Sequence, residues 1–347
     1  MKSSLLKFGN LSLLLLAAIA GWFWYDMNRY MDTPMHVPPE GYVLDVQTGS
    51  HLTRILHQLS QEQILKKPIY LKIYSRWHNL GDKIHVGEYQ LTTAMTPLQL
   101  LNDLHEGKVI QYSITIVEGW TFNQLIQHIQ ENPYLKHTLK DDDPRTVMAA
   151  LGDADMHPEG RFMADTYYYP RGLSDVDFLK RSYDAMTSYL AEKWPDRDVG
   201  LPVKTPYEAL ILASIVEKET GLASERRMIA GVFSRRLQKR MRLQSDPTVI
   251  YGMGEQYQGN IRRRDLNADN PYNTYQRFGL PPTPIALPGR DAIDAVLHPQ
   301  DGDALYFVSK GDGSHYFSAN LEQHNEAVIR YQLKGRKKPF SSYQTKE

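Results

Sequence analysis

Apolar residues recur at three- and four-residue intervals between Thr205 and Gly221, and this spacing predicts an amphipathic helix. Thr205 suits the N-cap, Pro206 suits the first helical position, and Glu208 can complete a capping box. Gly221 can adopt the left-handed conformation that stops a helix. The pattern therefore predicts a well-bounded helix whose last turn contains a carboxylate, Glu219.

Glu219 lies on the apolar face of this helix, which it shares with Leu212, Ile215 and Val216. Glu217 lies about 200° away around the helix and is predicted to be a solvated neighbour. Apolar neighbours and the negative end of a helix dipole both raise the pKa of a carboxyl group, so Glu219 is the candidate general acid. The pattern alone leaves open that both glutamates lie at a solvated helix end.

A long apolar run lies near the N-terminus, over 8–25, where only Asn10 and Ser12 are polar. About eighteen apolar residues nearly suffice to span a bilayer, and lysines before such a run favour an inside N-terminus. The run predicts a transmembrane anchor, a cytoplasmic tail over 1–7 and an exported remainder. The alternative is a cleaved signal peptide, because Ala18-Ile19-Ala20 resembles a cleavage site.

Downstream of the run, the pattern predicts a proline-rich linker and then two folded parts. A short strand followed by a helix occurs three times, beginning near Tyr42, Tyr89 and Ile114. Further helices follow, so the fold class is α+β; whether the small subdomain binds a ligand stays open. The predicted segments are a linker at 26–40, a small α+β subdomain at 41–112, a mixed α+β domain at 113–340 with the acid at the end of a buried helix, and a tail at 341–347.

Composition excludes several classes of function. Among the 347 residues, 40 basic side chains balance 40 acidic ones, so we predict no nucleic-acid partner. The chain has no cysteine, which excludes disulfides and thiol chemistry. Neither an H-E-x-x-H motif nor a Walker A loop is present, so no metal and no nucleotide cofactor is predicted. Ser214 lacks the G-x-S-x-G elbow of a serine hydrolase.

Polar and aromatic residues concentrate in the loops that follow the glutamate helix, over 241–254, 271–275 and 279–285. Asp, Asn, Gln and Thr side chains hydrogen-bond sugar hydroxyls and amides, and tyrosine rings pack on the C–H faces of sugars. The loops therefore favour a carbohydrate-binding groove. Their prolines are equally compatible with rigid turns that bind no ligand.

A single carboxyl acid limits the ways in which a glycosidic bond can be cleaved. Hydrolases use two carboxylates, and Asp246 and Glu225 are the only nearby candidates for the second. With one acid/base, the substrate can supply the nucleophile itself. The C6 hydroxyl of the sugar then closes onto C1 and yields a 1,6-anhydro product without water.

Six short segments follow one another in a characteristic order. They are A-S-I-V-E-K-E-T from Ala213, A-S-E-R from Ala223, M-R-L-Q-S-D-P-T-V-I-Y-G-M-G from Met241, Y-N-T-Y from Tyr272, G-L-P-P from Gly279 and H-N at His324. The chain thereby resembles the MltG (YceG-like) family of endolytic murein transglycosylases over nearly its whole length. Arg161, Ala164 and Arg235 stand where the family usually has Trp, Pro and Asn, so no sugar contact is carried over to them.

The resemblance implies a reaction and a site. The reaction is cleavage of the β-1,4 bond between N-acetylmuramic acid and N-acetylglucosamine inside nascent peptidoglycan strands, which leaves 1,6-anhydro ends and limits strand elongation. The second glutamate of the E-K-E segment is the acid/base of the family, and here it is Glu219. We expect Gln244, Asp246, Tyr272 and Asn273 to position the strand.

The resemblance also implies a location and partners. It implies a single-pass inner-membrane protein with a periplasmic catalytic part, a LysM-like subdomain over 41–112, and peptidoglycan synthases as partners. Two other hypotheses stay open. One is a muramidase hydrolase with Asp246 as its second carboxylate, and the other is a non-catalytic, membrane-anchored scaffold that binds wall glycan and recruits a synthase.

Overall fold

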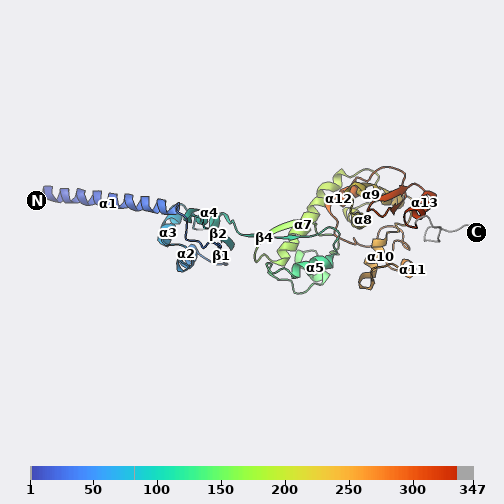
Figure 1. The fold of residues 1–347 in the computed structure, drawn as a ribbon, viewed down its shortest axis with the longest axis horizontal. Coiled ribbons are helices and arrows are strands. Elements are labelled where there is room, and N and C mark those ends of the chain that lie inside the picture. The colour runs from blue at the N-terminus through green and yellow to red at the C-terminus, as the bar shows by residue number, and fades with distance from the viewer. Residues whose placement is uncertain (1, 82, 334–347) are drawn as a thin grey trace, which may run out of the picture. The chain divides into compact units, whose positions relative to one another are not determined.

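The computed structural model of the chain describes residues 2–81 and 83–333, with the side chains of 2–10 and of residue 12 left aside. The chain folds into two compact units (Figure 1). The first unit contains the residues up to Tyr112 together with Tyr168–Gly172, and the second contains Ser113–Tyr167 and the residues from Leu173 onward. The predicted tail at 341–347 lies outside the described residues.

The first unit is built around one antiparallel strand pair. Its elements are α1 (Lys2–Met31), β1 (Tyr42–Val46), α2 (Leu52–Gln61), α3 (Pro68–Trp77), β2 (Gly87–Leu91) and α4 (Pro97–Glu106). β1 pairs with β2 so that Leu44 lies opposite Tyr89, and both side chains are buried. The predicted strand-then-helix order near Tyr42 and Tyr89 is confirmed by these elements.

Residues 26–40 differ from the predicted linker because they pack into the first unit. Met31, Met35 and Val37 belong to its buried core. The Met35 backbone N–H donates to the Met95 carbonyl oxygen at 2.9 Å. The segment up to Met31 is the end of α1, and in the extended part after it, alternate apolar residues between the prolines give one face that the core can bury.

Within the described part of the chain, we find no helix that combines the length and the apolar character needed to cross a membrane. The predicted anchor at 8–25 includes positions whose side chains lie outside the described residues. The anchor and the tail at 1–7 therefore stay predictions.

The second unit is mainly helical. It contains α5 (Phe122–Gln130), α6 (Pro144–Leu151), α7 (Asp175–Lys193), η1 (Trp194–Asp196), α8 (Pro206–Glu219), α9 (Ala223–Gln238), α10 (Asp246–Met253), η2 (Gly254–Gln256), α11 (Arg263–Leu266), α12 (Arg290–Leu297), β5 (Tyr306–Ser309), β6 (His315–Ser318) and α13 (Leu321–Tyr331). β5 and β6 form an antiparallel hairpin. A further pair joins β3 (Gln111–Thr115) to β4 (Thr166–Pro170). The predicted mixed α+β class is confirmed.

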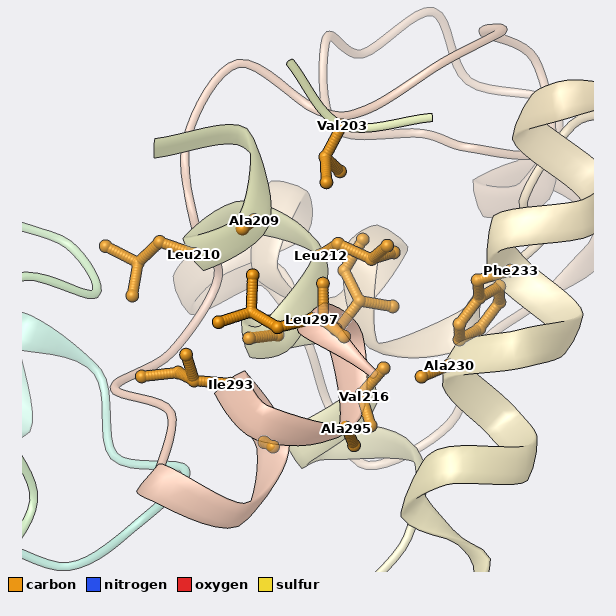
Figure 2. Packing of buried hydrophobic residues seen from close by; sticks show 14 of the residues in the cluster. Val203, Ala209, Leu210, Leu212, Val216, Ala230, Phe233, Ile293, Ala295 and Leu297 are labelled. Carbon is orange, nitrogen blue, oxygen red and sulfur yellow. The ribbon is translucent and has the colours of Figure 1, made fainter. Parts of the chain in front are cut away.

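Helix α8 lies at the centre of the core of the second unit. Every residue from Ala209 to Val216 is buried, because α9 and α12 pack against it. Figure 2 shows Leu212 and Val216 of α8 beside Phe233 of α9 and Leu297 of α12. A helix that is apolar on all sides is stable in water only when it is enclosed in this way. The enclosed helix holds its last residue, Glu219, in a fixed position.

Candidate active site

The start of α8 follows the sequence prediction, and its end does not. The Thr205 hydroxyl accepts a hydrogen bond from the Glu208 backbone N–H at 3.1 Å, as predicted for an N-cap. The predicted capping box is absent, because the Glu208 carboxylate accepts from the Lys204 N–H instead. Gly221 does not stop the helix in a left-handed conformation. The stop is Thr220, an extended residue with φ −147°.

The Glu219 carboxyl group is partly buried and contacts one hydroxyl. Its Oε1 accepts a hydrogen bond from Ser245 Oγ at 2.5 Å. Burial raises the pKa of Glu219 to about 7, the Ser245 hydrogen bond opposes this rise, and the charge of Asp246 adds to it. The carboxyl group therefore holds a proton near neutral pH, which is the property that a general acid needs.

Ser245 is fixed by a cluster of hydroxyl groups at the start of α10. Its side chain is buried, and its backbone N–H donates to Thr274 Oγ1 at 3.0 Å. The Thr248 hydroxyl donates to the Ser245 carbonyl at 2.7 Å and lies 2.8 Å from Thr274 Oγ1. Ser245 precedes α10 in the N-cap position but makes no capping bond, because its hydroxyl donates to Glu219. Sequence reasoning missed Ser245, although a serine before Asp-Pro is a recognisable helix start.

Two of the predicted strand-binding residues lie exposed on either side of Ser245. Asp246 accepts a hydrogen bond from the Tyr275 hydroxyl at 2.6 Å. Gln244 has a left-handed backbone, with φ 53°, and its Oε1 accepts from Arg236 Nη1 at 3.4 Å. Both side chains flank Ser245, whose hydroxyl contacts the acid, and their role in holding the strand stays a prediction.

The other two predicted strand-binding residues point inward. Asn273 is fully buried, and its side-chain N–H groups donate to the carbonyls of Asp265, Leu266 and Ala268. The Tyr272 hydroxyl is 2.9 Å from Thr283 Oγ1. The prediction that Asn273 contacts sugar is therefore corrected, because its amide is used entirely to shape its own loop.

Arg236 is a buried cation that sequence reasoning did not assign to the site. Its guanidinium donates to the backbone carbonyls of Leu305, at 2.6 Å, and Leu243, at 2.8 Å. Burial lowers its pKa from the usual value, and its charge in turn lowers the pKa of Glu219. Arg236 thus stabilises the Glu219 carboxylate that remains once the proton has left.

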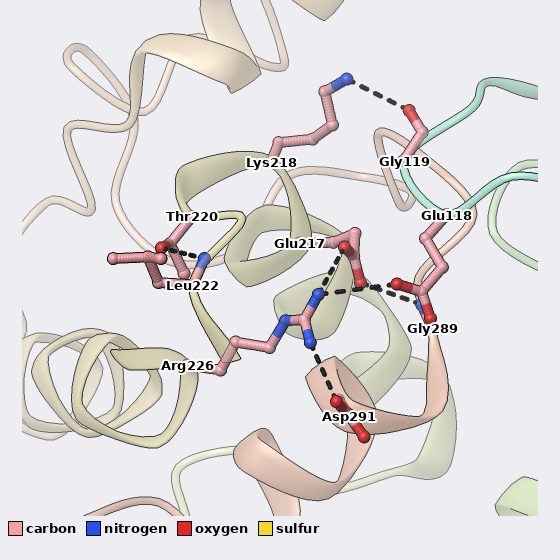
Figure 3. Close-up of polar contacts among 9 residues, drawn as sticks. All are labelled: Glu118, Gly119, Glu217, Lys218, Thr220, Leu222, Arg226, Gly289 and Asp291. Carbon is pink, nitrogen blue, oxygen red and sulfur yellow. Dashed lines mark hydrogen bonds and ion pairs between the residues drawn. The ribbon is translucent and has the colours of Figure 1, made fainter. Parts of the chain in front are cut away.

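Glu217 is not the solvated neighbour that the helix pattern predicted. Its side chain is only 6% exposed and lies 3.4 Å from the Arg226 guanidinium, which also pairs with Asp291 at 3.0 Å and Glu118 at 3.5 Å (Figure 3). The Gly289 N–H donates to Glu217 Oε2 at 3.0 Å. A Cβ atom at position 289 would lie 1.8 Å from Glu118 Oε1, so a larger residue there would displace the Glu118 side chain. Because Glu118, Arg226 and Gly289 lie against this face of the last turn of α8, Glu217 meets other elements instead of water.

The remaining chemical candidates have structural partners. Glu225 accepts from the backbone N–H of His315 at 3.0 Å and lies 2.7 Å from its Nδ1. Ser214 is buried and donates to the Ile211 carbonyl at 2.7 Å. Across the described residues, no group of three or more His, Cys, Asp or Glu side chains is arranged to hold a metal ion. Of the two candidates for the second carboxylate of a hydrolase, Asp246 and Glu225, Asp246 is therefore the one that lies beside Glu219.

Replacing Ser245 by alanine is expected to move the pH dependence of the reaction. The Ser245 hydrogen bond lowers the pKa of Glu219, so its loss raises that pKa further. Activity that requires protonated Glu219 falls as pH rises through its pKa, and in Ser245→Ala this fall should occur at higher pH. We expect kcat at its optimum to drop about tenfold, because the carboxylate form loses a hydrogen bond. A pH–kcat profile with an unmoved alkaline limb would contradict the role of Ser245.

Comparison with known proteins places this geometry in context. A model of the YceG-like family matches residues 44–330. An endolytic murein transglycosylase of Bacillus subtilis is 29% identical over 305 residues, which cover 83% of this chain and 84% of the relative. A protein of the same name from Streptococcus pneumoniae is 27% identical over 92% of this chain, which spans 63% of that relative. The crystal structure of a putative YceG-like protein from Listeria monocytogenes aligns with a TM-score of 0.53 and 29% identity, covering 83% of this chain and 99% of that one.

Proposed function

Because the chain belongs to the YceG-like family, we infer that it is an endolytic murein transglycosylase that cleaves glycan strands of peptidoglycan at internal bonds. The observation that carries the inference is the hydrogen bond from Ser245 to a carboxyl group, Glu219, whose pKa is raised to about 7 by burial. The exposed side chains of Gln244 and Asp246 adjoin this pair. An acid beside exposed polar groups suits the cleavage of a neutral glycosidic bond.

We propose that Glu219 acts first as acid and then as base. It donates its proton to the oxygen of the bond between N-acetylmuramic acid and N-acetylglucosamine, and the C1–O bond breaks. The resulting carboxylate, held by Ser245 and near Arg236, then takes the proton of the C6 hydroxyl. The C6 oxygen closes onto C1, so one bond breaks, one forms and no water is consumed. The enzyme ends the cycle protonated as it began.

The masses of the products separate this reaction from hydrolysis. Strands cut by the proposed route should end in 1,6-anhydro-N-acetylmuramic acid, lighter than a reducing end by one water. The two-carboxylate alternative, with Asp246 activating water, gives reducing ends instead. Mass spectrometry of strands digested by the purified chain checks this, and products that carry only reducing ends would refute ring closure.

The non-catalytic scaffold makes a different prediction from both enzymes. Such a protein would bind glycan strands and leave them uncut. The pairing of a proton-holding carboxyl group with a serine hydroxyl and a nearby arginine has no use in a scaffold, so this alternative is disfavoured. Uncut strands in the same digestion would restore it.

We further propose that the strands and helices from β1 to β2 form a LysM-like glycan-binding subdomain. Support comes from their order, in which two strands enclose two helices and pair antiparallel, with a core of their own. Hydrogen exchange on the Glu219→Gln full chain, with and without glycan strands, tests the proposal. Added strands should slow exchange within 42–91, and unchanged exchange there would remove this subdomain from glycan binding.

We also propose that the run at 8–25 anchors the chain in the cytoplasmic membrane, with the catalytic part outside it. The described side chains of Leu13, Leu14 and Leu15 on α1 are 63–71% exposed, and such a set of large apolar groups requires an apolar environment. Leu15→Arg should shift the chain from the membrane to the soluble fraction, whereas Val199→Arg, at an exposed loop, should not. Identical fractionation of both variants would end this proposal. Contact with peptidoglycan synthases stays a prediction from the resemblance.

A further inference from the structure

A small cavity lies between the end of α9 and the loop after Tyr275, outside the acid site described above. Its volume is about 390 Å³, and it is lined by Leu237, Arg240, Met241, Phe278 and Gly279. The Phe278 ring is 65% exposed, so it is accessible to a ligand. Gly279 has a φ of 84°, which lets the loop turn sharply beside the ring.

Arg240, which lines this cavity, and Arg242 beside it have no anionic partner within the part of the chain that the structure describes. Arg240 and Arg242 are exposed, and neither forms an ion pair there. The Arg242 guanidinium lies over the Phe278 ring, 4.8 Å from its centre. An exposed aromatic face next to unpaired guanidinium groups suits a ligand that combines a sugar ring with carboxylates.

Two segments that run side by side in opposite directions extend from the acid site towards this cavity. The Asp246 carboxylate accepts from the Tyr275 hydroxyl at 2.6 Å, and the Gln244 N–H donates to the Thr274 carbonyl at 3.2 Å. Farther from Glu219 along the same two segments, Arg242 of the first segment contacts Phe278 of the second. A polymer that places one bond at Glu219 and follows these segments therefore passes the cavity.

We infer that this cavity is a subsite for a peptide-bearing muramic acid unit of the glycan strand, with Phe278 beneath the sugar and Arg240 and Arg242 facing the carboxylates of the peptide. The inference rests on the proposed function, since only a murein strand carries this unit. It gives the cavity a role in selecting strands that still bear peptides.

Binding to inactive protein tests the subsite separately from catalysis. In a Glu219→Gln background, Phe278→Ala should weaken binding of peptide-bearing strands about tenfold, and Phe278→Trp should retain it. Arg242→Gln should weaken binding of peptide-bearing strands about tenfold but leave binding of strands stripped of peptides unchanged. Because both substituted side chains are exposed, the thermal midpoint of unfolding should stay within about 2 °C of the parent.

Two results would overturn the subsite. One is unchanged binding of peptide-bearing strands by Phe278→Ala, and the other is an equal loss for both kinds of strand in Arg242→Gln. These results are distinct from a failure of the proposed function, which would appear as wild-type protein that leaves strands uncut. Cleavage by the wild type together with unchanged binding by Phe278→Ala would leave the enzyme and remove the subsite.

Discussion

Glu219→Gln should abolish cleavage of glycan strands while the chain stays folded. Glutamine keeps the size of the side chain and can still accept the hydrogen bond from Ser245, but its amide has no acidic proton to transfer to the glycosidic oxygen. Because general acid–base catalysis contributes roughly 10²- to 10⁴-fold, and here the same group serves in both steps, we expect kcat to fall at least ~10³-fold. The rate of appearance of new strand ends, measured with purified protein, provides the test.

A matched control separates this loss from any general effect of removing a carboxylate. Glu192 on α7 has a side chain that is 70% exposed and, among the residues that the structure describes, pairs only with its neighbour Lys193, so Glu192→Gln should keep wild-type kcat. Circular dichroism and the thermal midpoint should match for all three proteins. If Glu219→Gln retained more than about a tenth of wild-type kcat, the assignment of the acid would be wrong.

Arg226→Met is expected to produce the largest loss of stability among single changes near the site. Its guanidinium is the only cation within 4 Å of the Glu217 carboxylate among the described residues, and the two side chains are 10% and 6% exposed. Removing one partner of a buried pair leaves an uncompensated charge, which typically costs about 3–5 kcal/mol. The free energy of unfolding from denaturant titration at neutral pH should fall by about 3 kcal/mol.

Two further variants check that the lost stability belongs to the buried pair. Adding Glu217→Gln to Arg226→Met removes the unpaired carboxylate and should restore part of the lost free energy. Arg290 pairs with Asp165 at 2.8 Å, but both side chains are nearly half exposed, so Arg290→Met should cost less than about 1 kcal/mol. Equal losses for Arg226→Met and Arg290→Met would show that burial of the pair is unimportant.

The environment of Glu217 illustrates what the sequence could not supply. Two of its neighbours, Glu118 and Gly289, come from segments distant in the chain, and Arg226 comes from the next helix. Helical periodicity orders side chains around one helix, but it does not reveal which faces other helices cover. Glu219 was identified because its helix has local caps and because the E-K-E segment resembles the family.

The corrected roles have the same origin. The N-cap at Thr205 was predicted because a cap depends on adjacent residues, whereas the stop at Thr220 depends on where α9 begins. Asn273 appeared suited to bind sugar by residue type alone, yet the path of its own loop directs its amide inward. Ser245 was missed because its importance lies in a contact 26 residues away.

The raised pKa of Glu219 also affects stability. A carboxyl group whose pKa rises from 4.5 to about 7 on folding binds its proton more tightly in the folded state. Its contribution to stability is therefore lost as pH rises from about 4.5 through about 7. Glu159, buried and accepting from the Tyr251 hydroxyl at 2.9 Å, has a pKa raised to about 7 by burial and adds to the same trend.

Direct titration of the Glu219 carboxyl group tests the central claim most directly. Carbon-13 NMR of glutamate-labelled wild type, with Glu219→Gln used to assign the resonance, reports the protonation of this one side chain. We expect a pKa of about 7 for Glu219 in the folded chain. A pKa at or below the ordinary 4.5 would contradict the account, because the group would then have no proton to donate at neutral pH.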